Sequence, residues 1–208
     1  RDCLDSSISK LIAFKPIFGI IFMYLNKIQD RKIPTMAVGI TRQVDLGLYY
    51  NPEFVLSLTQ YELRAVLIHE ALHILLNHIS RGYYYGYNSR VANYAADMAI
   101  NCHISGLPTW ALFPEKFGFP NFQSTEWYYE KIKEEAMKNS NGNTDQYLDG
   151  KSGQQADDHS KWNDCEKDII KEKLRNISEK AIKEQHQRGW SKIGTDLAKQ
   201  IIDANKTI

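Results

Sequence analysis

The chain has 208 residues, of which 43% are hydrophobic, and this suits one globular domain with a sizeable core. The chain has 26 lysine and arginine residues and 25 aspartate and glutamate residues, so its formal charge is +1. This near-neutral charge does not indicate a surface that binds nucleic acid. The cysteines (Cys3, Cys102, Cys165) form no CxxC pair, which argues against a zinc ribbon or a disulfide framework. Scattered cysteines favour a reducing, cytoplasmic setting.

Residues 4–30 read as one or two helices with an apolar face. The stretch Leu11 to Leu25, "LIAFKPIFGIIFMYL", resembles a membrane or signal segment, but Lys15 and Pro16 interrupt it. A spanning helix needs about 20 apolar residues, and a signal segment is followed by small residues rather than by "NKIQDRK". We therefore expect a buried N-terminal helix and no membrane partner.

Residues 33–50 predict a β-hairpin with strands at Met36–Ile40 and Leu46–Tyr50 and polar turn residues between them. Asn51 and Pro52 end the second strand. The first strand is either a plain structural element or an exposed edge that accepts a peptide by strand addition.

A long helix follows the hairpin. Thr59 and Glu62 form a capping-box pattern before an apolar run, and we expect the helix to reach about Ile79. The loop after it, "RGYYYGYNS", either folds its rings onto the core or supplies an oxyanion donor or pocket wall from Tyr83, Tyr84, Tyr85 and Tyr87.

The rest of the chain is expected to be largely helical. A helix is predicted over about Arg90–Ile104, and residues 124–138 are predicted to form a charged, amphipathic helix in which "EKIKEEAMK" is a solvated face. Residues 139–156 are polar and glycine-rich, which indicates a mobile loop, and residues 157–208 form a C-terminal helical segment. We expect one domain over residues 1–208, with its core in about 1–138.

His69, Glu70 and His73 form an H-E-x-x-H pattern inside the apolar helix. Positions i and i+4 share a helix face, so the two imidazoles can point nitrogens at one Zn²⁺ ion. Glu70 is offset by one position and can take a proton from metal-bound water. The alternative is a helix surface with two hydrogen-bonded histidines.

A catalytic zinc needs a third protein ligand. His78 lies nine residues after His69, on the opposite side of a continuous helix, and no glycine breaks that helix before it. We therefore expect His78 to be structural or to lie behind the ligands. Asp97 is the better candidate, since Asn93, Asp97 and Asn101 form one polar stripe whose amides can orient the carboxylate. Otherwise this stripe hydrogen-bonds to a neighbouring loop.

The segments "NPEFVLSLTQYELRAVLIHEALHILLNH" and "NYAADMAIN" resemble a family of putative metallopeptidase domains from bacteria and phages. The resemblance runs from about Phe18 to Trp162 and is most specific over His69–His78 and Ala95–Asn101. Members often precede a von Willebrand A-like domain. These 208 residues leave no room for that domain, so we carry over no partner role for it.

The resemblance implies an α+β fold of the zincin type, close to the gluzincins (minigluzincin-like). This fold is mostly helical, with a small sheet beside the active-site helix. It further implies that His69, His73 and Asp97 bind zinc and that Glu70 is the general base. The stretch "DDHSKW" also looks like a family motif, and its His159 is either an oxyanion donor or a surface histidine.

We therefore expect a zinc-dependent hydrolase that cleaves peptide bonds in a peptide or protein substrate, because mixed imidazole and carboxylate ligands suit Zn²⁺. A zincin-fold binding or scaffold protein with structural zinc is the alternative, and His159 is the obvious fourth ligand for it. A metal-free helical protein is a third possibility.

Overall fold

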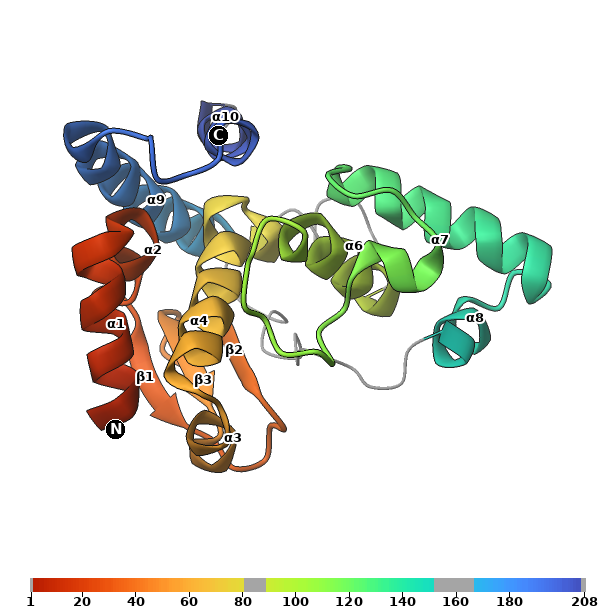
Figure 1. The fold of residues 1–208 in the computed structure, drawn as a ribbon, viewed down its shortest axis with the longest axis horizontal. Helices are drawn as coiled ribbons and strands as arrows, with labels where there is room; N and C mark the ends of the chain where they lie inside the picture. The colour runs from red at the N-terminus through yellow and green to blue at the C-terminus, as the bar shows by residue number, and fades with distance from the viewer. Residues whose placement is uncertain (1, 81–88, 152–166, 207–208) are drawn as a thin grey trace.

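The helices and the small sheet are described for residues 2–80, 89–151 and 167–206 of a computed structural model (Figure 1). The elements in chain order are α1 (Asp2–Phe14), α2 (Pro16–Ile21), β1 (Asn26–Gln29), β2 (Met36–Ile40), β3 (Leu46–Tyr50), α3 (Pro52–Ser57), α4 (Gln60–Leu75), α6 (Ser89–Asn101), the 3₁₀ helix η1 (Pro114–Phe117), α7 (Thr125–Asn139), α8 (Thr144–Lys151), α9 (Lys167–Arg188) and α10 (Thr195–Lys206). The expected class, α+β with a helical majority and a small sheet, is confirmed.

The three-stranded sheet has the order β1-β3-β2, so β2 is an edge strand. Strands β2 and β3 form the predicted hairpin with the predicted boundaries, and β1 pairs with β3 in parallel. The N–H of Asn51 donates to Thr35 O and the N–H of Thr41 donates to Asp45 O. Narrow and wide pairs alternate in an antiparallel ladder, so the N–H of Val38 points away from β3, toward the open edge.

Helix α4 lies at the centre of the larger part of the molecule, with α1, α2, β2, α6, α9 and α10 packed around it (Figure 1). The expected capping box begins it: Glu62 N–H donates to the Thr59 hydroxyl, and Thr59 N–H donates to the Glu62 carboxylate. From Leu63 almost every residue of α4 is buried. A helix that is apolar all round must be covered all round, and this is the case here.

Helix α4 ends earlier than predicted, at Leu75 rather than at about Ile79. Asn77 adopts a left-handed conformation with φ 58°, which breaks the helix without a glycine. The expectation that nothing breaks the helix before His78 was therefore wrong, because asparagine tolerates this conformation better than most residues.

Two hydrophobic clusters build the interior. The first core cluster joins residues from both halves of the chain around α4, among them Leu4, Phe18, Leu48, Leu67, Leu174 and Ile201. The second core cluster holds α6, α7 and α8 together, with Tyr94, Met98, Phe117, Tyr128, Ile132 and Leu148 among its members. Helix α6 contributes Ile100 to the first cluster and Met98 to the second, so it lies at their junction.

The apolar N-terminal stretch, which resembles a membrane or signal segment in sequence, forms buried helices, as expected. Helices α1 and α2 meet at Lys15, and their apolar residues lie in the first core cluster. In the described part of the chain, every helix is too short or too polar to cross a membrane.

Four elements were not predicted from the sequence. Strand β1 lies within residues 4–30, where helices were expected, so that expectation was wrong for residues 26–29. Helices α3 and η1 lie where no element was expected, and α8 occupies Thr144–Lys151 within the stretch expected to be a loop. Tyr147 and Leu148 explain α8, because both are buried in the second core cluster.

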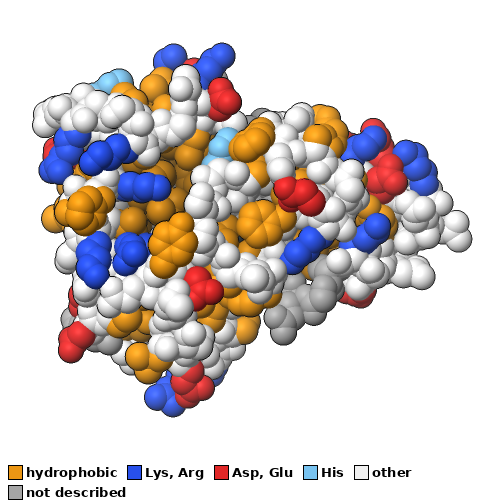
Figure 2. Space-filling view, in the orientation of Figure 1, with side chains coloured by type: hydrophobic (Ala, Val, Ile, Leu, Met, Phe, Trp, Pro, Cys, Tyr) orange, Lys and Arg blue, Asp and Glu red, His pale blue; other side chains and the backbone are white. Residues whose placement is uncertain are grey.

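The surface carries charges of both signs (Figure 2). Basic and acidic side chains are interspersed over α7, where Lys131 pairs with Glu134 and Lys138 pairs with Glu135. The expected amphipathic helix over residues 124–138 is confirmed, because Tyr128 and Ile132 are buried on one face while charged residues are exposed on the other.

Candidate metal centre

The H-E-x-x-H residues lie on one buried stretch of α4. His69 and His73 are one turn apart, and their rings meet edge to face with centroids 4.6 Å apart. The Nε2 atoms of the two rings are 3.0 Å apart. Both side chains are buried, so their polar atoms depend on partners inside the protein.

Asp97 comes to the same point from α6. Its Oδ1 lies 3.4 Å from His73 Nε2 and 3.7 Å from His69 Nε2. All three ligand atoms lie within 4.8 Å of one another, and this is the group in the described residues that could hold a metal ion. The structure therefore brings together the three residues that the sequence singled out as ligands.

The donor set fits a divalent ion such as zinc. With Zn–N bonds of about 2.0–2.1 Å, two nitrogens on a tetrahedral ion are about 3.3 Å apart. The observed separations of 3.0, 3.4 and 3.7 Å bracket this value. Two neutral imidazoles and one carboxylate are ligands typical of zinc.

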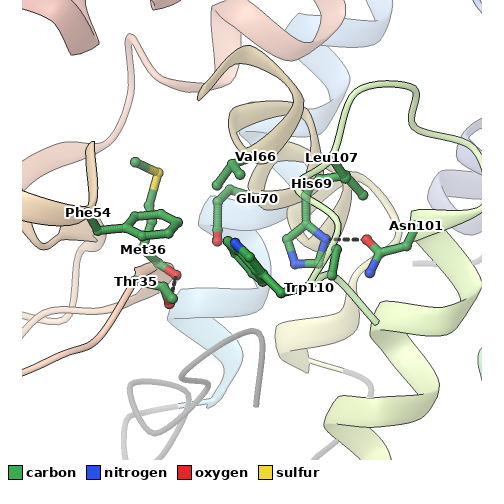
Figure 3. A pocket seen from close by; sticks show the side chains of 10 residues that line it. Thr35, Met36, Phe54, Val66, His69, Glu70, Asn101, Leu107 and Trp110 are labelled. Atoms are coloured by element: carbon green, nitrogen blue, oxygen red, sulfur yellow. Dashed lines mark hydrogen bonds between the residues drawn. The ribbon is translucent and has the colours of Figure 1, made fainter. Parts of the chain in front are cut away.

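His69 is held by an amide from α6. Its Nδ1 lies 2.7 Å from Asn101 Oδ1, and the Asn101 amide group donates from Nδ2 to Leu112 O at 2.8 Å (Figure 3). The second bond orients the amide with its oxygen toward His69, so His69 carries its proton on Nδ1 and leaves Nε2 for a ligand. Asn101 was expected to orient Asp97. The bond to His69 Nδ1 shows instead that Asn101 orients His69.

His73 is held by a second histidine. Its Nδ1 lies 3.0 Å from His78 Nδ1, and the other ring nitrogen of His78 lies 3.1 Å from the Thr125 hydroxyl. The turn at Asn77 makes this possible, because a continuous helix would carry His78 away from His73. The expectation that His78 lies behind the ligands agrees with this contact.

Glu70 is tied to the edge of the sheet. The N–H of Val38, which points out from β2, donates to Glu70 Oε2 at 2.7 Å. The Glu70 side chain is 1% exposed, and this bond satisfies part of its hydrogen-bonding capacity. Sequence reasoning missed Val38 because a backbone donor leaves no residue-type signature.

A pocket opens beside His69 and Glu70. Figure 3 shows both side chains directed toward it, together with Trp110 and Phe54. Met36, Phe54, Val66, Leu107 and Trp110 form its apolar walls. Such walls lower the local dielectric and strengthen electrostatic interactions at the polar groups.

Two titratable residues after Asn101 stay neutral near pH 7. Burial raises the pKa of the Cys102 thiol and lowers the pKa of the His103 imidazole. Neither belongs to the group that could hold a metal in the described residues. Within the described residues, the candidate centre therefore consists of the ligands from α4 and α6.

Some predicted contributors lie outside the described residues. His159, expected as an oxyanion donor or an extra ligand, is one of them, as are the tyrosines of residues 81–88.

Comparison with known proteins gives one finding. A family model described as a putative metallopeptidase domain matches residues 2–205. No curated protein and no solved structure matches the chain.

Proposed function

Because this chain belongs to the putative metallopeptidase domain family, we propose that it is a zinc-dependent hydrolase of peptide bonds with a zincin-like active site. The observation that carries the proposal is the convergence of three ligand atoms from α4 and α6 beside Glu70. His69, His73 and Asp97 would hold the ion. When bound, zinc supplies Lewis acidity that polarises the substrate carbonyl and makes water more acidic.

The chain's own residues perform the remaining tasks. The Glu70 carboxylate takes the proton of the attacking water and returns it to the leaving amine. The Val38 N–H fixes one oxygen of that carboxylate and favours its ionised form, which is the form a base needs. Asn101 keeps Nε2 of His69 free of a proton for metal binding.

The alternative function, a scaffold with structural zinc, calls for a different ligand count. Structural zinc sites have four protein ligands, whereas catalytic sites have three. The three-residue group in the described parts of the chain matches the ligand count of a catalytic site, and His159, the candidate fourth ligand, lies outside those parts. Cleavage by the zinc-loaded protein therefore decides between the two functions. In the same proposal, His159 contributes to stabilising the oxyanion.

Glu70→Gln tests the mechanism most directly. The substitution keeps the size and the hydrogen-bond acceptor but removes the base, so cleavage should fall about 10²- to 10⁴-fold while zinc content stays unchanged. Cleavage is measured by mass spectrometry on a library of peptides from a digested proteome. Zinc is measured by elemental analysis of the same preparations.

Glu130→Gln is the matched control, because Glu130 is an exposed glutamate on α7 that belongs neither to the candidate metal group nor to the pocket lining in the described residues. Its cleavage should equal that of the parent. Equal cleavage by Glu70→Gln and the parent would remove Glu70 from the mechanism. Zinc-loaded parent protein that cleaves no peptide in the library would favour the scaffold.

A further inference from the structure

A chain of hydrogen bonds leads away from the candidate metal centre through His73. It runs from His73 Nδ1 to His78 Nδ1 over 3.0 Å, and from His78 Nε2 to Thr125 Oγ1 over 3.1 Å. The two rings pack edge to face with centroids 5.1 Å apart. His73 and His78 are 0% and 4% exposed, so solvent does not replace the bond between their rings, whereas the bond to Thr125 is only partly buried.

Local structure sets each member of this chain in place. The left-handed Asn77 turns the backbone so that His78 comes back against α4. Thr125 is the first residue of α7, and the cap of that helix is made by Ser124, whose hydroxyl accepts the Trp127 N–H. The Thr125 hydroxyl is therefore not needed as a helix cap, and it bonds to His78.

The two histidines on α4 differ in how firmly their tautomers are set. Asn101 offers His69 an acceptor only, because its own Nδ2 is used by Leu112 O. His78 offers His73 either a donor or an acceptor, depending on which of its nitrogens carries the proton. The Thr125 hydroxyl can also donate or accept, so it accommodates both arrangements.

We propose that His78 and Thr125 are positioning residues that form a tautomer relay, which switches His73 into its ligand form when the centre takes up metal. The proposal rests on the proposed function for its metal ion. In metal-free protein, His69 presents a lone pair at Nε2, so His73 donates to it from Nε2 across 3.0 Å. His73 Nδ1 then accepts from His78, and His78 Nε2 accepts from the Thr125 hydroxyl.

When His73 Nε2 serves as a ligand, its bond to His69 is lost. The His73–His78 and His78–Thr125 bonds then reverse direction. His73 carries its proton on Nδ1 and donates to His78 Nδ1, and His78 donates from Nε2 to the Thr125 oxygen. The proton between the two Nδ1 atoms moves from His78 to His73. One proton leaves His73 Nε2 and one enters at His78 Nε2, both exchanged with water, so both imidazoles stay neutral.

Thr125→Val and Thr125→Ser test the relay as a matched pair. Valine keeps the shape but removes the Thr125 oxygen that accepts from His78 Nε2–H in the metal-bound arrangement, which disfavours the ligand form of His73. We expect the zinc dissociation constant of Thr125→Val to rise about tenfold, as is typical for a lost partner of a ligand histidine. Serine restores the hydroxyl, so Thr125→Ser should stay within about threefold of the parent. Competition with a chelator measures each constant.

Nuclear magnetic resonance detects the change of histidine tautomer directly in the parent protein. In protein labelled with ¹⁵N at histidine, two-bond ¹H–¹⁵N spectra distinguish a ring protonated at Nδ1 from one protonated at Nε2. We expect both His73 and His78 to exchange tautomer on zinc loading, while His69 keeps its proton on Nδ1. His78→Asn assigns the His78 signals. It also keeps an acceptor near His73, so it should bind zinc more tightly than His78→Leu.

The outcomes separate this inference from the proposed function. A His78 tautomer that is the same with and without zinc would refute the relay, and so would equal zinc affinity for the valine and serine variants. Zinc binding and cleavage by the parent would leave the proposed function standing in either case. If the parent binds zinc without cleaving, the proposed function fails and the spectra still decide the relay. A parent that binds no zinc overturns both.

Discussion

The ligand residues could be predicted from the sequence because their spacing carries geometric information. An i, i+4 pair shares a helix face wherever the helix lies, so His69 and His73 needed no knowledge of the fold. Asp97 stood out as a carboxylate on an otherwise apolar helix, and its Oδ1 lies 3.4 Å from His73 Nε2. The partners of the ligands were harder to predict, because each bond joins residues from different elements.

Asn101 shows why those partners are difficult to predict. Its place in the polar stripe was recognised, but which neighbour it bonds depends on how α6 crosses α4. The amide contacts His69 at 2.7 Å. Val38 and Thr125 carried no signal in the sequence, since a strand amide and a helix-start threonine are common features.

Asp97→Ala should remove most of the bound zinc, because it leaves two nitrogen ligands where a catalytic site needs three protein ligands. The measurement is zinc stoichiometry after dialysis, together with thermal unfolding of the metal-free protein. A buried carboxylate is costly without the ion that it binds, so the metal-free fold should persist when Asp97 is removed.

Asn93→Ala is the control for this prediction. Asn93 lies one turn earlier on α6 and is absent from the group of metal-ligating atoms in the described structure. Its zinc stoichiometry should match that of the parent. Undiminished zinc in Asp97→Ala would remove the carboxylate from the ligand set.

Elements with strong local patterns were predicted well, and elements that depend on distant partners were missed. The hairpin strands are short apolar runs flanked by turn residues, and their predicted boundaries agree with β2 and β3. Strand β1 is polar and largely exposed, so no apolar periodicity marks it, and it exists by pairing with β3. Helix α3 did have a local signal, an Asn51 cap before a proline, which was interpreted only as the end of a strand.

The contact between α1 and α2 depends on a residue without a side chain. A Cβ atom on Gly19 would lie 2.7 Å from Ile12 Cα, closer than real Cβ contacts occur. Gly19→Ala should therefore force the helices apart and destabilise the protein by about 1–3 kcal/mol. Urea unfolding measures this change.

Gly150→Ala serves as the comparison for that substitution. Gly150 lies in α8, where a Cβ atom would meet nothing within 4 Å. Alanine also has a higher helix propensity than glycine. This variant should unfold at the same or slightly higher urea concentration. If Gly19→Ala behaves like Gly150→Ala, α1 and α2 are not in tight contact in solution.

On the scale of the whole molecule, the candidate metal centre lies where the two core clusters meet. Helix α4 carries His69 and His73 from the first cluster, and α6 carries Asp97 along the boundary. Helix α7, packed in the second cluster, adds Thr125 behind His73. This convergence could not be predicted from the sequence, because hydrophobic patterns show which faces are buried but not which faces meet.

Helix α10 closes the far end of α4 through two asparagines. Asn205 Nδ2 donates to Leu75 O at 2.8 Å, and Asn77 Nδ2 donates to Ala204 O at 3.0 Å. The last carbonyls of a helix have no partner within it, so α10 satisfies a group that α4 leaves open.

Asn205→Ala should lower the free energy of unfolding by about 1 kcal/mol, because it leaves a carbonyl at the end of α4 without its donor. Asn139→Ala is the control, since its amide bonds only to an exposed carbonyl and carboxylate of its own helix α7. Urea unfolding of both variants gives the comparison. Equal losses would show that the bond from α10 adds nothing to the closure of α4.

The bond between Leu75 and Asn205 spans 130 residues of sequence. A ribosome adds about 5–20 residues per second, so about 6 to 26 seconds separate the synthesis of the two partners. Throughout that interval of translation, the Leu75 carbonyl lacks its donor from α10. The nascent polypeptide can therefore close the carboxyl end of the helix that carries His69 and His73 in this way only after synthesis has passed residue 205.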